Sequence, residues 1–391
     1  MKDLVINSTI QHTLLLFIPL IFAYVLKIAK VRRWSILGGV LGGIILGPAV
    51  FGSAAPEYWD GIFQGGVHEQ ALYRQLERQQ EADVAAAVKL GVSDSFILQL
   101  KAQQHEQLIE PKANWKAGQW RDQRTLRDYA IALIFLILLS GSMRQQAKGL
   151  APPLTMLSVG VWAAIIPGGL LAALSYWLWG TPATTALAFG ATLAVGPWTL
   201  QKWEQKVADE GSSQGAALML KCGRVAWVVA SGVALYVTWN HLGAMSLVWL
   251  LPLILLPIIW IFRARNWKWL TIFVEYAAIP SVMATALVLI HPFEEFSLWP
   301  TLIVILLCAD GRWLGGIVGL SLLGGYTSER VMKLSIPLVD SGISQLCLTG
   351  LLFGAGVLPA PFALAALIGT VFLECTAPIR MKFAKNKLTV D

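Results

Sequence analysis

The chain is dominated by apolar runs that are close in length to a membrane-spanning helix. Leu14–Ala29, Ile131–Leu139 and Leu247–Phe262 are three of them, and similar runs recur along the chain. An α-helix needs about 20 apolar residues to cross roughly 30 Å of hydrocarbon. Of the 391 residues, 56% are hydrophobic and 14% are charged, whereas a soluble domain carries about 25% charged residues. The sequence therefore predicts an all-α integral membrane protein surrounded by a lipid bilayer.

Eleven spanning helices are predicted from these runs. The first is longer than the apolar core of a typical signal peptide and is followed by basic residues, so we expect it to be retained as a spanning helix. The predicted spans cover residues 11–29, 35–51, 128–143, 154–178, 184–199, 216–239, 246–262, 269–290, 299–321, 334–356 and 360–379.

Basic residues are concentrated in alternate predicted loops. They are Lys27, Lys30, Arg32 and Arg33, then Arg144 and Lys148, Lys202 and Lys206, Arg263, Arg265 and Lys268, Arg330 and Lys333, and the basic tail over residues 380–391. Cytoplasmic loops are enriched in Lys and Arg. We therefore expect an external N-terminus and a cytoplasmic C-terminus in a cell membrane, the inner membrane of a bacterium. The net charge of +7 is explained by these loops, so no nucleic-acid partner is expected.

A polar insertion over residues 54–127 divides the transmembrane part into residues 1–53 and 128–379. His68–Leu90 is rich in good helix formers, and Ser93 can cap a second helix that runs to about Ile109. Pro111 is expected to end that second helix. The sequence therefore predicts an extracytoplasmic helical hairpin that is available to bind a protein partner.

The spans after the first fall into two groups of five. Because five is odd, the two groups would have inverted topology, which is typical of transporters. The fourth member of each group is interrupted, at Gly190–Pro197 and at Pro337–Gly342. Irregular backbone at membrane depth is tolerated only where protein or a polar cavity covers it. We therefore predict two broken helices, marked by Gly196, Pro197, Pro337 and Gly342, around a central site.

Charged residues inside the predicted spans are the candidates for that site, because such charges are costly and usually functional. They are Lys221, Arg224, Glu275, Asp310, Arg312, Asp340 and Glu374. Glu275 and Glu374 lie near the cytoplasmic ends of their spans, so we expect structural roles for them. Asp310 and Arg312 are two residues apart on a helix and cannot face each other. We predict a buried ion pair between Asp340 and either Arg312 or Arg224.

Soluble-enzyme chemistry has no support in the sequence. No hydrolase, kinase or nucleotide-binding motif is present, and the glycines of residues 38–47 lie inside a span, where they favour close helix packing. Cys222, Cys308, Cys347 and Cys375 form no CxxC or Cys/His spacing, so neither a metal site nor a disulfide framework is predicted. We expect no enzyme activity and no cofactor.

Several of these segments resemble the monovalent cation:proton antiporter superfamily, the sodium/hydrogen exchanger-like transporters. Ile36–Pro48 is similar to the family's "LGYLLAGILIGP" helix, and Gly190–Pro197 is similar to its "GAxLSxTDP" crossing helix. Shorter matches are Phe135–Gly141 with the third helix, Gly311–Gly315 with the late helix whose arginine helps to hold the ion site, and Pro337–Leu348 with the second crossing helix. The resemblance implies an antiporter fold, exchange of a monovalent cation for a proton, and a homodimer.

The chain departs from the family where the family binds its ion. Residues 215–236 contain no carboxylate but contain Lys221 and Arg224, and the positions of two further acidic residues are occupied by Gly196 and Met143. A fixed cation repels Na⁺ or K⁺ and cannot replace an oxygen ligand. We therefore expect no ordinary electrogenic Na⁺/H⁺ exchange.

Three functions remain compatible with the sequence. The first is a divergent antiporter in which Asp340 or Asp310 is a relocated proton carrier. The second is a transport-inactive sensor or membrane subunit that binds a partner through the 54–127 insertion. The third is an anion transporter in which Lys221, Arg224 and Arg312 attract a negative substrate.

Overall fold

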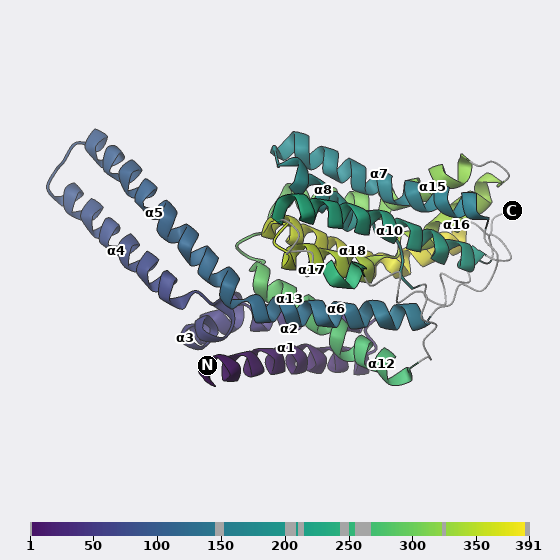
Figure 1. Ribbon diagram of the computed structural model, residues 1–391, viewed down its shortest axis with the longest axis horizontal. Coiled ribbons are helices and arrows are strands. Elements are labelled where there is room, and N and C mark those ends of the chain that lie inside the picture. Colours follow the sequence, from purple (N-terminus) through teal and green to yellow (C-terminus); the bar gives the residue numbers. More distant parts are fainter. Residues whose placement is uncertain are drawn as a thin grey trace. The chain divides into compact units, whose positions relative to one another are not determined.

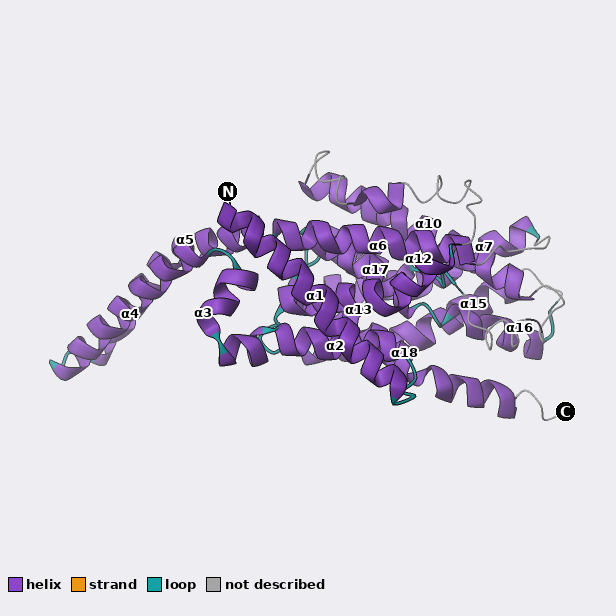
Figure 2. Cartoon of the chain, turned by 90° about the horizontal axis from the view of Figure 1, so that it is seen from below, coloured by secondary structure: helices purple, strands orange, loops and turns teal. Residues whose placement is uncertain are grey.

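The computed structural model describes residues 2–144, 152–199, 209, 215–242, 250–254, 267–322 and 326–387. Within these ranges every regular element is a helix (Figures 1 and 2), which confirms the all-helical prediction. The chain forms two compact units. One consists of residues 1–14 and 46–127, and the other of residues 15–45 and 128–391.

The first unit contains the hairpin predicted for the insertion. Two short elements, α3 (Pro56–Trp59) and the π-helical η2 (Asp60–Gln64), lead into α4 (Val67–Lys89), which packs along α5 (Asp94–Asp122) (Figure 1). Two glutamines fix their register. Gln80 Nε2 donates to the carbonyl oxygen of Gln104 at 3.2 Å, and Gln104 Nε2 donates to that of Gln80 at 3.3 Å.

The predicted end of the second insertion helix at Pro111 is wrong. Helix α5 continues through Pro111 to Asp122. Contacts between α4 and α5 persist beyond the proline, where the rings of Tyr73 and Trp115 stack with their centroids 5.5 Å apart. Tertiary packing of this kind offsets the hydrogen bond that a proline removes from a helix.

The other helices have the following bounds: α1 (Lys2–Ile28), α2 (Trp34–Leu46), η1 (Pro48–Gly52), α6 (Arg124–Arg144), α7 (Pro153–Trp179), α8 (Ala183–Ala194), α10 (Gly215–Leu242), α12 (Lys268–Phe273), η4 (Val274–Ala278), α13 (Ile279–Ile290), α14 (Leu298–Leu306), η5 (Leu307–Gly311), α15 (Arg312–Ser321), α16 (Ser328–Ser335), η6 (Ile336–Leu338), α17 (Gly342–Gly354) and α18 (Ala360–Lys387). Buried apolar side chains from the helices within residues 15–45 and 128–391 form the core of the second unit.

Within the described ranges, seven helical segments are long and apolar enough to cross a membrane. They are Ser8–Ile28, Trp34–Gly52, Pro153–Trp179, Gly215–His241, Lys268–Ile290, Leu298–Ser321 and Ala360–Ala377. An eighth results if Ser328–Leu338 and Gly342–Gly354, which are bent by 46°, form one span. Two other predicted spans correspond to the shorter Ala183–Ala194 and to part of α6. The span predicted at 246–262 lies mostly outside the described residues, so the count of eleven stays a prediction.

The second predicted interruption is present, and at the first the structure shows the end of a helix. Helix α8 continues past Gly190, where the interruption was predicted to begin, and ends at Ala194, and Val195 is extended with φ −74° and ψ 139°. Residues 200–208, which follow this segment, lie outside the described range. The second interruption lies between the 3₁₀ turn η6 and the start of α17 at Gly342. Asp340 lies in this interruption, within the second unit.

Close packing of α15 on α7 depends on Gly315. A Cβ atom at this position would lie 2.6 Å from the carbonyl oxygen of Trp162 and 2.7 Å from the Cα atom of Ala163. Both are backbone atoms of α7, so neither can move aside without a shift of the whole helix. The two helices can approach this closely only because α15 has no side chain here.

Replacing Gly315 by alanine is expected to lower the free energy of unfolding by about 1–3 kcal/mol, the usual cost of overpacking. Thermal unfolding of the purified protein in detergent measures the effect. The matched control is Gly232→Ala in α10, where a Cβ atom meets nothing within 4 Å and where alanine is a better helix former than glycine. Equal losses in the two variants would contradict the close approach of α7 and α15.

Candidate functional site: a buried charge network at the helix breaks

The backbone that follows α8 meets the start of α17 in the interior of the second unit. The backbone N–H of Trp198, just after the first interruption, donates to Ser344 Oγ in the first turns of α17 at 3.2 Å. The indole Nε1 of Trp198 donates to the carbonyl oxygen of Leu138 in α6 at 2.8 Å. The irregular backbone after α8 is therefore anchored both to the second broken helix and to α6.

Arg312 joins the end of α8 directly to α17, the helix that follows the second interruption. Its side chain is fully buried, with 1% exposed. Nε donates to the carbonyl oxygen of Leu193 at 3.1 Å, and Nη2 donates to Gln345 Oε1 at 2.9 Å. Leu193 lies in the last turn of α8, whose carbonyl oxygens lack partners within the helix and bear partial negative charge. One guanidinium therefore caps the end of α8 and also binds α17.

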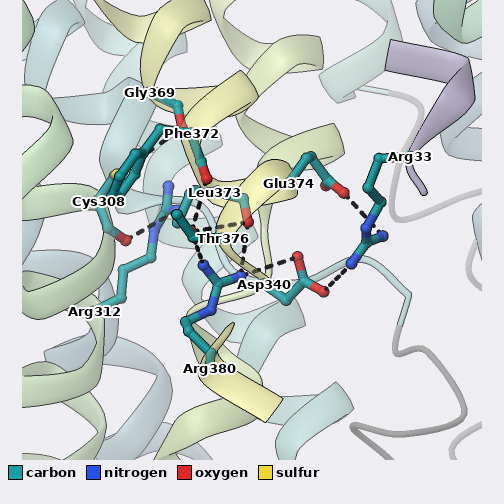
Figure 3. A network of polar contacts seen from close by, with 10 residues as sticks. All are labelled: Arg33, Cys308, Arg312, Asp340, Gly369, Phe372, Leu373, Glu374, Thr376 and Arg380. Carbon is teal, nitrogen blue, oxygen red and sulfur yellow. Dashed lines mark hydrogen bonds and ion pairs between the residues drawn. The ribbon is translucent and has the colours of Figure 1, made fainter. Parts of the chain in front are cut away.

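Asp340 forms ion pairs with two arginines that are far from it in the sequence. Its Oδ2 lies 3.0 Å from Nη2 of Arg33, and its Oδ1 lies 3.7 Å from Nη2 of Arg380 (Figure 3). The side chain of Asp340 is 5% exposed, and those of the arginines are 14% and 15% exposed. Arg33 follows α1 in a left-handed conformation with φ 60°, which is uncommon for a residue with a Cβ atom.

Glu374 is the second carboxylate of the network. Its Oε2 lies 2.8 Å from Nη1 of Arg33, and its side chain is 3% exposed. Arg33 therefore lies between the carboxyl groups of Glu374 and Asp340 (Figure 3). The carboxyl of Glu374 lies beside Gly342 at the N-terminus of α17, where the helix dipole favours negative charge.

Gly342 makes room for this carboxylate. A Cβ atom at Gly342 would lie 2.5 Å from Oε1 of Glu374, so no larger residue fits at the first position of α17 while the carboxylate stays in place.

Arg380 completes the network from the C-terminal part of α18. Its Nη1 donates to Thr376 Oγ1 at 2.6 Å, and its Nη2 donates to the carbonyl oxygen of Leu373 at 2.9 Å. These bonds hold the guanidinium against its own helix and direct it toward Asp340 (Figure 3).

The four side chains balance in charge, because two arginines face two carboxylates. Taking charges out of water is expensive unless they are paired and hydrogen-bonded. Removal or protonation of one carboxylate would leave the cluster with excess positive charge. The second broken helix is therefore held by groups whose attraction depends on the charge of Asp340 and Glu374.

The predicted partner of Asp340 was wrong. Its ion pairs are with Arg33 and Arg380, whereas Arg312 donates to carbonyl and amide oxygens. The pairing with Arg224 was wrong as well, since Arg224 lies half-buried on α10 and forms no ion pair with Asp340.

The other predicted site residues occupy different places. Lys221 is half-buried on α10, and Asp310 is exposed on η5. Gly196 and Pro197 follow α8, and Pro337 and Gly342 border the second interruption.

Three residues of the network were missed as site residues. Arg33 and Arg380 were attributed to cytoplasmic basic segments, and Glu374 to a structural role near a span end. One signal in the sequence could have pointed to them. Glu374 is a carboxylate inside a predicted span, and a charge at that depth needs a cationic partner nearby.

The described residues contain no group of three His, Cys, Asp or Glu side chains that could hold a metal ion. No protein-family model matches the chain, and no curated protein matches it.

Proposed function

We propose that the chain is a membrane transporter with an antiporter-like core, in which Asp340 and Glu374 carry the coupled proton. The observation that supports this most is the position of two buried carboxylates at one helix interruption. The helix that follows this interruption, α17, is bound to the end of α8 through Arg312 and to Trp198 through Ser344. Broken helices in contact near the middle of a helical bundle are the usual place for substrate and coupling ions in transporters.

The proposed coupling uses competition for the carboxylates. With both deprotonated, Arg33 and Arg380 neutralise them. A proton bound to Asp340 or Glu374 weakens the attraction of that carboxylate for Arg33, so the segment that joins α1 and α2 is released from the second interruption. A monovalent cation can occupy the deprotonated carboxylate only when the guanidinium has moved away. Proton and cation would then exclude each other, which is the requirement for exchange.

The second candidate is a membrane subunit without transport activity. It is favoured by the occupation of both carboxylates by arginine side chains, which fill the place that a cation would need. An anion transporter has less support, because Arg33 and Arg380 face carboxylates and Arg312 donates to uncharged oxygens.

Ion flux through the purified protein in lipid vesicles tests the proposal. A pH gradient is imposed, and its dissipation is followed with an enclosed pH dye after addition of Na⁺, K⁺ or Cl⁻ salts, with choline salts and empty vesicles as controls. The proposal predicts dissipation that requires Na⁺ or K⁺. Flux that depends on the anion would support the anion transporter, and no flux above that of empty vesicles would support the inactive subunit; either result would contradict the proposal.

A further inference from the structure

Asp310 lies near the midpoint of one of the segments that are long enough to cross a membrane. The segment Leu298–Ser321 has 24 residues, so its rise of 1.5 Å per residue places Asp310 roughly 16–18 Å from either end. It lies on the π-helical turn η5, between α14 and α15. Its side chain is exposed.

The face that surrounds Asp310 is apolar and also exposed. Trp299, Leu302, Leu306 and Leu314 follow one another at spacings that place them with Asp310 on one side of the helix, and they are 68%, 46%, 62% and 47% exposed. Such a face is suited either to lipid or to another helix.

A carboxylate does not suit lipid. Among the described residues Asp310 has no hydrogen bond or ion pair, and Arg312 points into the core instead. A charge near the middle of a spanning helix is costly, and the aspartate side chain is too short to reach the headgroups from this depth. Inside a bilayer this face therefore lacks a partner for the carboxylate of Asp310.

We propose that this face is a docking surface for a membrane-spanning helix of another protein, one that presents a Lys or Arg side chain near its own midpoint. A helix is required because it satisfies its backbone hydrogen bonds internally at membrane depth. A basic side chain is required because it complements Asp310, which lies in the middle of the apolar stripe. The inference rests on the membrane location in the proposed function and on nothing else in it.

A second copy of this chain fits the surface less well. In the described part of the chain, no candidate span presents an exposed Lys or Arg near its midpoint. Arg312 is buried, and Lys221 and Arg224 are half-buried toward the start of the segment Gly215–His241.

The test uses a synthetic spanning peptide of leucine and alanine with a single central lysine. The full-length protein and the peptide carry a donor and an acceptor dye, and energy transfer between them is measured in lipid vesicles over a range of peptide-to-lipid ratios. Peptides with a central leucine or glutamate in place of the lysine are the matched controls. We expect the lysine peptide to bind about 5- to 30-fold more tightly than the leucine peptide, the range that a polar contact between membrane helices provides.

Two variants assign this preference to Asp310. Asp310→Asn is expected to remove the preference for lysine, whereas Leu170→Asn, on an exposed position of α7, is expected to keep it. Equal binding of the lysine and leucine peptides by the wild-type protein would overturn the proposal. Energy transfer between labelled copies of the protein that is lost in Asp310→Asn would also overturn it, because the occupant would then be a second copy.

Extraction of the vesicles at alkaline pH distinguishes a failure of the docking proposal from a failure of the proposed function. Protein that is released from the vesicles would refute the membrane location, and with it both proposals. Protein that remains in the vesicles and shows no preference for lysine would refute the docking surface alone.

Discussion

Replacing Asp340 by alanine is expected to lower the free energy of unfolding by about 3–5 kcal/mol, the usual cost of breaking a buried ion pair from one side. The substitution removes the carboxylate that both Arg33 and Arg380 face, in a cluster whose side chains are 3% to 15% exposed. Thermal or denaturant-induced unfolding in detergent measures the loss.

A matched control is available on the surface of α16. Glu329→Ala removes the partner of Lys333, but Glu329 is 55% exposed, and exposed pairs contribute about 0–1 kcal/mol. The variant Asp340→Asn keeps the shape of the side chain and removes its charge, so it separates the electrostatic effect from the packing effect. Similar losses in Asp340→Ala and Glu329→Ala would contradict the buried network.

The second large effect is expected at Arg312. Replacement by lysine keeps the charge but cannot reach Leu193 and Gln345 together, because an ammonium group lacks the planar fork of a guanidinium. A lost hydrogen bond to a charged group costs about 1.5–3 kcal/mol, and a buried acceptor left unpaired costs about 1–3 kcal/mol. We therefore expect Arg312→Lys to lower the free energy of unfolding by about 2–5 kcal/mol.

The control for this variant is Arg330→Lys, at an exposed position of α16, for which no measurable loss is expected. Gln345→Leu removes the acceptor on α17, and a double-mutant cycle with Arg312→Lys measures the coupling between them. Unchanged stability of Arg312→Lys, or independent effects of the two substitutions, would show that Arg312 does not tie α8 to α17.

Local features of the sequence predicted the helices, the second interruption and the end of α8 near Pro197. Long apolar runs have no stable alternative to helices in a bilayer, and Pro197 and Pro337 each restrict the backbone next to them. These effects act within a few residues, so they can be read without knowledge of the fold. Pro111 was the exception, because packing of α5 against α4 outweighed the local preference.

The pairing of the charges could not be predicted in the same way. Arg33 and Asp340 are 307 residues apart, and their contact depends on how the end of α1 packs in the folded unit. Arg33 and Arg380 were already explained by the enrichment of basic residues in cytoplasmic segments, so nothing in the sequence required a second role. The family resemblance suggested Arg312 as the partner of Asp340, because the similar arginine of the family helps to hold the ion site. In the structure its guanidinium instead donates to Leu193 and Gln345.

The assignment of the proton to Asp340 and Glu374 is tested most directly by flux through vesicles that contain the neutralised variant Asp340→Asn/Glu374→Gln. The comparison is with the wild-type protein and with Asp310→Asn, all assayed under one pH gradient with the cation that supports wild-type exchange. The account predicts that the double variant falls to the rate of empty vesicles while Asp310→Asn exchanges at the wild-type rate. Exchange by the double variant at the wild-type rate would contradict it.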